Sequence, residues 1–110
     1  MRVITGLARG RRLETLPGEE TRPTAERVKE ALFSILQFEI EGRRVLDLFA
    51  GSGQLGIEAL SRGAESCVFV DKNPAAVEVI RRNLRACGLY EHTQVLAADA
   101  AGYLARRSGR

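Results

Sequence analysis

The chain has 110 residues, of which 45% are apolar, and its 17 basic and 14 acidic side chains give a net charge of +3. This length suits one small domain with a buried core, and the composition argues against a disordered chain. No apolar run approaches the roughly 20 residues that span a bilayer, and the N-terminus has no signal-peptide pattern. We therefore expect a cytoplasmic protein with no membrane partner.

Arginine outnumbers lysine by fifteen to two, and residues 1–29 hold seven basic side chains against four acidic ones. Guanidinium groups suit bidentate contacts with phosphate. The same bias also fits a solvated surface, so composition alone leaves a nucleic-acid partner open. Cys67 and Cys87 have no C-x-x-C spacing, and the chain has one histidine. We expect both cysteines to be small buried side chains and predict no metal site.

The first 42 residues predict a hairpin followed by a helix. Residues 2–5 and 11–16 have the composition of two short strands, with Gly6 and Gly10 between them. A loop over 17–23 leads to a helix that starts just after Pro23 and ends near Gly42, with Thr24 as the N-cap. The apolar stripe of this helix consists of Ala25, Val28, Ala31, Leu32, Ile35 and Leu36.

From residue 43 onward, short apolar runs alternate with helical patterns. Strands are predicted over 45–49, 66–70 and 94–98, the first of them buried on both faces. Helices are predicted over 54–62, from Asn73-Pro74 to Gly88, and over 100–107. The inward-facing residues are expected to be Leu55, Ala59 and Leu60 in the first helix, and Val77, Ile80, Leu84 and Cys87 in the second.

This order is the βαβαβ unit of a doubly wound, Rossmann-like α/β sheet with right-handed crossovers. A three-stranded parallel sheet with an unprotected edge is unusual for a complete domain. We therefore expect a fragment with two parts. Residues 1–42 form an N-terminal extension, and residues 43–110 form a partial nucleotide-binding domain that stops before a fourth strand.

A glycine-rich turn follows the first of these strands. Residues 51–56 match G-x-G-x-x-G between a strand and a helix. Glycine lets the backbone turn sharply and approach a ligand closely, and the helix N-terminus behind it favours anions. The same pattern occurs at NAD and FAD sites, so the turn alone predicts a nucleotide site of unspecified type.

Asp47 favours S-adenosylmethionine over a dinucleotide, and two further aspartates end the other predicted strands. Asp47 lies inside a buried strand, where a carboxylate needs a partner. The ammonium group of a sulfonium amino acid is such a partner, whereas a pyrophosphate is not. Asp71 ends the second strand and can accept both ribose hydroxyls, a feature shared with NAD sites. Asp99 ends the third strand and can receive the adenine amino group. Asp71 could instead simply end a strand, and Asp99 could cap a helix.

The chain strongly resembles the bacterial 16S ribosomal RNA guanine-N2 methyltransferases, which are class I S-adenosylmethionine-dependent methyltransferases. Four segments carry the resemblance, which covers essentially the whole chain: residues 2–13, 21–24, 27–36 and 45–53. The segments before residue 37 are the specific portion, because the glycine loop alone would identify only the superfamily.

The resemblance implies a guanine exocyclic amine as methyl acceptor and 16S ribosomal RNA or the small ribosomal subunit as partner of a monomeric enzyme. It implies S-adenosylmethionine binding by Asp47, Phe49, Ala50, Gly51, Ser52, Gly53, Asp71, Lys72, Asn73, Asp99 and Ala100. It also implies RNA contacts by the N-terminal residues Arg9, Arg11, Arg12, Arg22, Thr24 and Arg27.

One departure from the family pattern limits this expectation. Family members are longer and carry an Asp/Asn-Pro-Pro-Tyr motif on a fourth strand, but the only prolines here are Pro17, Pro23 and Pro74. We therefore assign no catalytic residue and expect the chain alone to be nearly inactive. Two alternatives stay open, a truncated RNA-binding fragment without catalysis and a fragment of an NAD-binding oxidoreductase.

Overall fold

A three-stranded parallel sheet forms the centre of the molecule. The computed structural model describes residues 2–16, 23–36, 39–48 and 50–108. The strands are β1 (Arg44–Leu48), β2 (Ser66–Asp71) and β3 (Thr93–Ala97), in the spatial order β1-β2-β3. In the register, Asp47 lies beside Phe69 and Asp71 beside Ala97. The predicted parallel βαβαβ unit is confirmed, and the observed strands differ from the predicted ones by one residue at one or both ends.

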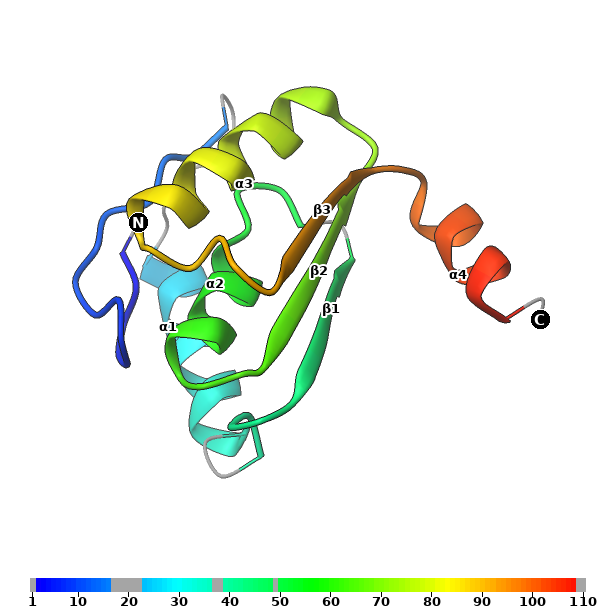
Figure 1. The fold of residues 1–110 in the computed structure, drawn as a ribbon. Coiled ribbons are helices and arrows are strands. Elements are labelled where there is room, and N and C mark those ends of the chain that lie inside the picture. Colours follow the sequence, from blue (N-terminus) through cyan, green and yellow to red (C-terminus); the bar gives the residue numbers. More distant parts are fainter. Residues whose placement is uncertain (1, 17–22, 37–38, 49, 109–110) are drawn as a thin grey trace.

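Four helices accompany the sheet: α1 (Pro23–Leu36), α2 (Gln54–Ser61), α3 (Pro74–Ala86) and α4 (Ala100–Ser108). Figure 1 shows α2 and α3 on one side of the sheet and α4 on the other. The predicted start of α3 is confirmed, because the Asn73 side chain accepts a hydrogen bond from the Ala75 N–H at 3.0 Å and Pro74 is the first helical residue. None of the helices in the described part of the chain is long and apolar enough to cross a membrane.

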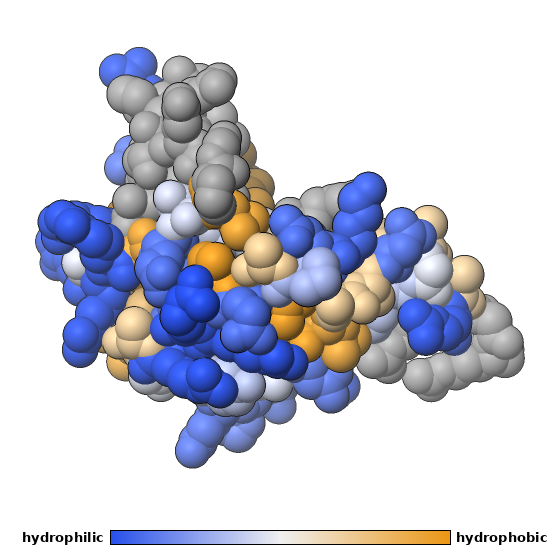
Figure 2. Space-filling model, turned by 90° about the horizontal axis from the view of Figure 1, so that it is seen from above, coloured by the Kyte–Doolittle hydropathy of each residue, from blue (hydrophilic) through white to orange (hydrophobic). Residues whose placement is uncertain are grey.

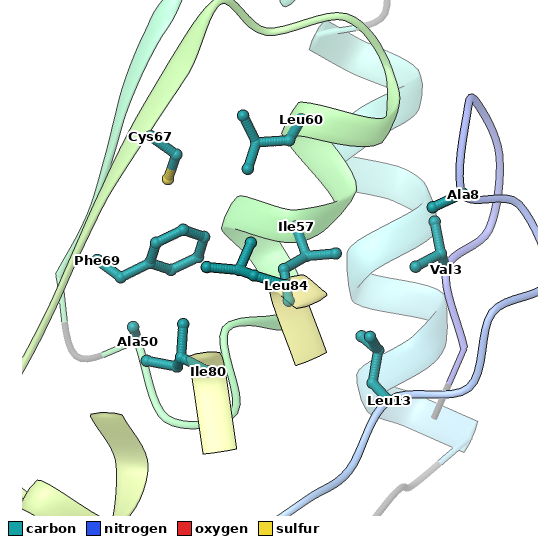
Figure 3. Packing of buried hydrophobic residues seen from close by; sticks show 10 residues of the cluster. All are labelled: Val3, Ala8, Leu13, Ala50, Ile57, Leu60, Cys67, Phe69, Ile80 and Leu84. Carbon is teal, nitrogen blue, oxygen red and sulfur yellow. The ribbon is translucent and has the colours of Figure 1, made fainter. Parts of the chain in front are cut away.

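The hydrophobic core joins the N-terminal segment to the sheet and to α2 and α3 (Figure 3). Phe69 on β2 and Ile80 on α3 are fully buried at its centre. The third glycine of the turn, Gly56, permits this packing, because a Cβ on it would lie 2.4 Å from the Phe69 ring. The N-terminal segment contributes Val3, Ala8 and Leu13 to the same core. Residues 2–13 are therefore packed onto the domain.

The predicted N-terminal hairpin is present only as a chain reversal. A single antiparallel bridge joins Arg2 and Arg12, and neither predicted strand forms. Gly6 has a φ of +88°, and a Cβ on it would lie 1.8 Å from the Ser61 carbonyl oxygen. The segment follows the surface of α2 at this point, because its backbone bonds to α2 instead of continuing a strand ladder.

A buried carboxylate on α2 holds this segment in place. The two oxygens of Glu58 accept hydrogen bonds from the backbone N–H groups of Ile4 and Thr5, at 2.8 and 3.1 Å. The same carboxylate pairs with Lys29 at 3.4 Å and with Arg62 at 3.0 Å. Glu58 is fully buried, so its charge is compensated by two cations and two amides.

This network fits the orientation of α1, in which two residues of the predicted apolar stripe are exposed. Leu32 is 40% exposed and Ile35 is 77% exposed, whereas Lys29 and Phe33 are only 2% and 4% exposed. Lys29 and Phe33 are four residues apart and therefore share one face of the helix. That face contacts α2, because Lys29 pairs with Glu58 and the Arg62 guanidinium lies 4.7 Å from the centre of the Phe33 ring.

The limits of α1 also differ from the prediction. The helix begins at Pro23 itself, so Thr24 lies in the first turn instead of at the cap. Proline is favourable at this position because its missing N–H has no partner in the first turn. The helix ends at Leu36, well before Gly42. The predicted loop over residues 17–22 lies outside the described residues, as do the side chains of Ala25, Val28 and Leu36.

Two leucines that were expected to be buried are exposed. Leu55 on α2 and Leu46 on β1 are each 42% exposed. β1 is an edge strand, so the prediction that it is buried on both faces is wrong at Leu46. Ala59 and Leu60 on α2, and Val77, Ile80 and Leu84 on α3, are buried as predicted.

Candidate cofactor site at the carboxyl edge of the sheet

The three aspartates singled out in the sequence lie at the carboxyl ends of the three strands. Asp47 is the fourth residue of β1, Asp71 is the last residue of β2, and Asp99 follows β3 by two residues. All three strands point their carboxyl ends the same way in Figure 1. Figure 2 looks onto the molecule from that side and shows hydrophobic atoms in the middle of the face with hydrophilic ones around them.

The glycine loop adopts the tight turn that its sequence predicts. Gly51 and Gly53 have φ angles of +58° and +83°, in the left-handed region that favours glycine. The Gly53 N–H donates to the Ala50 carbonyl at 2.8 Å, and the Gly53 carbonyl accepts from Ile57 at 2.9 Å. The loop therefore turns directly into the first turn of α2, whose N-terminal end lies at the carboxyl edge of the sheet.

Asp71 connects two loops at this edge. One carboxylate oxygen accepts a hydrogen bond from the Gly51 N–H at 3.0 Å, and the other accepts from the Asn73 N–H at 2.9 Å. The carboxylate therefore fixes the start of the glycine loop relative to the end of β2. Each carboxylate oxygen has two lone pairs, so both oxygens can accept a further hydrogen bond from a ligand.

Asp47 has a partner inside the protein. Its carboxylate accepts a hydrogen bond from the Gly56 N–H at 3.1 Å, in the first turn of α2. Burial raises the pKa of Asp47 from 3.8 to about 6, while the Gly56 hydrogen bond lowers it and the charge of Asp71 raises it. The two carboxylates therefore repel each other. A cation near them would offset this repulsion and the cost of burying the charge of Asp47.

The remaining predicted cofactor residues follow the other two strand ends. Asp99 is exposed, and its carboxylate accepts from the Gly102 N–H at 3.0 Å, which caps α4. Ala100 is buried at the start of α4, Lys72 is exposed, and the Asn73 side chain caps α3. Asp99 thus has the capping role that was considered for it, and one of its oxygens is not needed for that bond. Phe49 lies outside the described residues.

The structure brings the glycine loop together with two of the aspartates and fits the polar groups of S-adenosylmethionine. Asp71 supplies acceptors for hydroxyl groups beside the backbone of Gly51. Asp47, beside Asp71, is a buried carboxylate whose charge a cation would stabilise. Among the described residues no group of three or more His, Cys, Asp or Glu side chains is arranged to hold a metal ion.

Comparison with known proteins places this chain in a family. The family described as conserved hypothetical protein 95 matches residues 1–110, the whole chain. This chain belongs to that family. The predicted resemblance to bacterial ribosomal RNA methyltransferases is thereby confirmed at the level of the family, because other proteins similar to the chain are named ribosomal RNA small subunit methyltransferase D.

Relatives of this conserved hypothetical protein 95 member include enzymes named for ribosomal RNA. "Putative rRNA methyltransferase YlbH" of Bacillus subtilis is 50% identical over 100 residues, which are 91% of this chain and 54% of that protein. Ribosomal RNA small subunit methyltransferase D of Haemophilus influenzae is 46% identical over 77% of this chain and 44% of its own length. The chain thus spans about half the length of these relatives.

A solved structure shows the same fold. That of "Putative methyltransferase yhhF" from Escherichia coli superimposes with a TM-score of 0.85 at 37% identity, over 96% of this chain and 57% of that one. The Rossmann-like class I methyltransferase fold predicted from the sequence is therefore confirmed.

The predicted RNA-contacting residues of this family member lie on the N-terminal segment and α1. Arg9, Arg11 and Arg12 are exposed on the chain reversal, and Arg27 is exposed on α1. Arg22 and the side chain of Thr24 lie outside the described residues. No contact in the structure tests their role, so RNA binding by these residues stays a prediction.

Sequence reasoning missed one residue beside the glycine loop. Asn83 on α3 is 1% exposed and bonds to the Ser52 carbonyl at 2.9 Å. The only signal in the sequence is an asparagine between the buried Ile80 and Leu84 on an otherwise apolar helix face. A polar side chain on such a face requires hydrogen-bond partners, but the sequence does not say which ones.

Proposed function

We propose that this chain supplies the S-adenosylmethionine-binding part of an enzyme that methylates the N2 amine of a guanine in 16S ribosomal RNA. The observation that carries the proposal is the buried Asp47 carboxylate at the glycine loop, because its charge favours a cationic ligand and not a pyrophosphate. The bond between the Asp71 carboxylate and the Gly51 N–H supports it, because an acceptor at this position can receive ribose hydroxyls. Membership of a family with relatives named for ribosomal RNA methylation supports the reaction and its substrate.

The ribose, adenine and ammonium groups of the cofactor each have a counterpart among the residues of the site. Asp71 accepts the ribose hydroxyls, Asp99 receives the adenine amino group, and Asp47 holds the ammonium group directly or through water. The backbone of Gly51, Ser52 and Gly53 approaches the ligand closely, because no side chain intervenes at the glycines. Bound S-adenosylmethionine supplies an electrophilic methyl group, and its transfer depends mainly on positioning the donor against the acceptor.

The exposed arginines provide a surface for the second substrate. Arg9, Arg11 and Arg12 lie within four residues on a chain reversal that is packed onto α2. Guanidinium groups on a rigid support can contact successive phosphates without ordering a loop first. We propose that 16S ribosomal RNA or the small subunit binds here, to a monomeric cytoplasmic protein.

Calorimetric titration with S-adenosylhomocysteine and NADH, filter binding of 16S RNA, and methyl incorporation, all with the 110-residue chain, separate this proposal from its alternatives. We expect S-adenosylhomocysteine binding and 16S RNA binding that weakens as salt rises. We also expect little methyl incorporation, because the sequence has no Asp/Asn-Pro-Pro-Tyr motif to hold the acceptor base. RNA binding without S-adenosylhomocysteine binding would favour an RNA-binding fragment without a cofactor. Binding of NADH instead would favour the oxidoreductase.

A further inference from the structure

Asn83 uses both the nitrogen and the oxygen of its side-chain amide in the protein interior. It lies on the inner face of α3, between Ile80 and Leu84, and is 1% exposed. Its oxygen accepts from the Glu14 N–H at 2.8 Å, and its nitrogen donates to the Glu14 carbonyl at 3.0 Å. The side chain thus pairs with the backbone of Glu14 as a second peptide unit would.

The same amide nitrogen also reaches the glycine loop. It donates to the Ser52 carbonyl at 2.9 Å. Ser52 is fully buried and lies between Gly51 and Gly53, both of which have positive φ. The orientation of the amide is determined, because a flipped side chain would turn its oxygen toward two carbonyl groups and its nitrogen toward an N–H.

Asn83 therefore links the glycine loop to a segment distant in the sequence. Glu14 is 69 residues from Asn83, and Ser52 is 31 residues from it. Glu14 comes two residues after Arg12, at the end of the arginine-bearing reversal. A side chain that bonds both segments fixes the conformation of the loop and its distance from the arginines.

We propose that Asn83 is a positioning residue for the cofactor site, which holds the glycine loop in its ligand-binding conformation against the N-terminal segment. This inference rests on the proposed function, because it assumes that the loop binds S-adenosylmethionine. The bond to Ser52 stabilises a loop conformation in which Gly51 and Gly53 have positive φ, which glycine adopts at low cost. A carboxylate in place of the amide would still accept from Glu14 but would oppose both carbonyls.

The test compares calorimetric S-adenosylhomocysteine affinities of the wild-type chain with those of three variants on α3. Asn83→Asp replaces the donor by an acceptor. Arg82→Ala removes the neighbouring exposed ion pair with Glu14, 3.0 Å in length, and leaves the loop bond intact. Val79→Ala removes buried methyl groups from the same helix, so it lowers stability without removing the Asn83 bond to the loop.

We expect Asn83→Asp to bind S-adenosylhomocysteine at least tenfold more weakly at a temperature where all variants are folded, and the other two to stay within twofold of wild type. Equal affinities of Asn83→Asp and wild type would overturn the proposal and leave Asn83 a structural residue. If Asn83→Asp does not fold, Asn83→Ser, which removes the amide without adding a charge, decides by the same comparison. Absence of binding by the wild-type chain would instead refute the proposed function.

Discussion

Two carboxylates at the same sheet edge have different environments. Asp71 is half-buried and bonds to backbone N–H groups on both sides, whereas Asp47 is buried beneath the loop with one N–H partner and a raised pKa. Asp71 can therefore contact a ligand without a large change in solvation. Asp47 instead gains from any cation that enters the site.

Replacement of Asp71 by alanine tests the ribose contact. We expect Asp71→Ala to weaken S-adenosylhomocysteine binding by roughly 1.5–3 kcal/mol, because charge-assisted hydrogen bonds to the ligand are lost and Gly51 loses its partner. Calorimetric titration measures the change, with Glu78→Ala, which removes an exposed carboxylate on α3, as the control. An affinity equal to that of the control would leave Asp71 with only its role at the strand end.

The raised pKa of Asp47 predicts a pH-dependent cost in stability. The folded protein binds this proton more tightly than the unfolded chain does, so the stabilisation from protonation is complete below the ordinary pKa of 3.8 and is lost as pH rises through about 6. Asp47→Asn keeps an acceptor for Gly56 and cannot ionise. We expect it to gain stability relative to wild type across this window, by up to about 3 kcal/mol.

Chemical unfolding of both proteins at several pH values measures this difference. A constant difference between Asp47→Asn and wild type from pH 4 to pH 7 would contradict a raised pKa at Asp47. Ligand binding should reverse the shift, because an ammonium group beside Asp47 favours the carboxylate.

At the scale of single residues, the sequence predicts the position of a site residue when that position follows from the neighbouring strand or helix. Asp71 and Asp99 were predictable because parallel strands bring their carboxyl ends to one edge. The bonds of Asn83 were not, because its partners lie 69 and 31 residues away. The Gly56 N–H as the partner of Asp47 was also missed, although a buried carboxylate was known to need one.

Among the elements, α1 shows how a buried charge can override an apolar pattern. Its stripe of aliphatic residues predicts one inward face, but Lys29 and Phe33 face α2 while Leu32 and Ile35 are exposed. The reason is the pair that Lys29 forms with Glu58, whose existence depends on two elements meeting in space. Sequence periodicity describes one helix at a time, so it cannot reveal such a pair.

Removal of Glu58 should show how much the element contacts depend on this carboxylate. Glu58→Ala leaves Lys29 buried without its counter-charge and the N–H groups of Ile4 and Thr5 without acceptors. We expect a loss of about 3–5 kcal/mol in the free energy of unfolding, measured by denaturant titration. Glu65→Ala breaks an exposed pair with Arg44 and should cost less than about 1 kcal/mol.

Similar losses for these two variants would refute the role given to Glu58. If Glu58→Ala does not fold, Glu58→Gln replaces it, because it keeps one acceptor and removes the charge. We expect Glu58→Gln to fold and to lose more free energy of unfolding than Glu65→Ala.

The arginine-bearing reversal offers a test at the level of a segment. A variant with alanine at Arg9, Arg11 and Arg12 should bind 16S RNA more weakly. The slope of its log affinity against log salt concentration should be shallower, by an amount that corresponds to the loss of about two to three phosphate contacts. Its S-adenosylhomocysteine affinity should stay at the wild-type value, because these side chains are exposed and lie outside the loop. Equal losses in both affinities would indicate misfolding instead.

At the scale of the whole molecule, the fold was largely predictable because its signals are local. Two element boundaries follow from backbone chemistry alone, at Asn73-Pro74 and at Gly63, and the apolar runs mark the strands between them. How the N-terminal segment attaches was not predictable, because its hairpin pattern gives way to bonds with Glu58 and Ser61. The division at residue 42 into an RNA-contacting part and a cofactor-binding part stays a prediction, although both parts share one core.

The central claim, that this loop binds S-adenosylmethionine and no dinucleotide, is tested most directly by calorimetric titration of the folded wild-type chain with S-adenosylhomocysteine and, separately, with NADH. The account predicts saturable binding of one S-adenosylhomocysteine per chain and no binding of NADH at the same concentrations. No binding of S-adenosylhomocysteine, or equal binding of both, would contradict it.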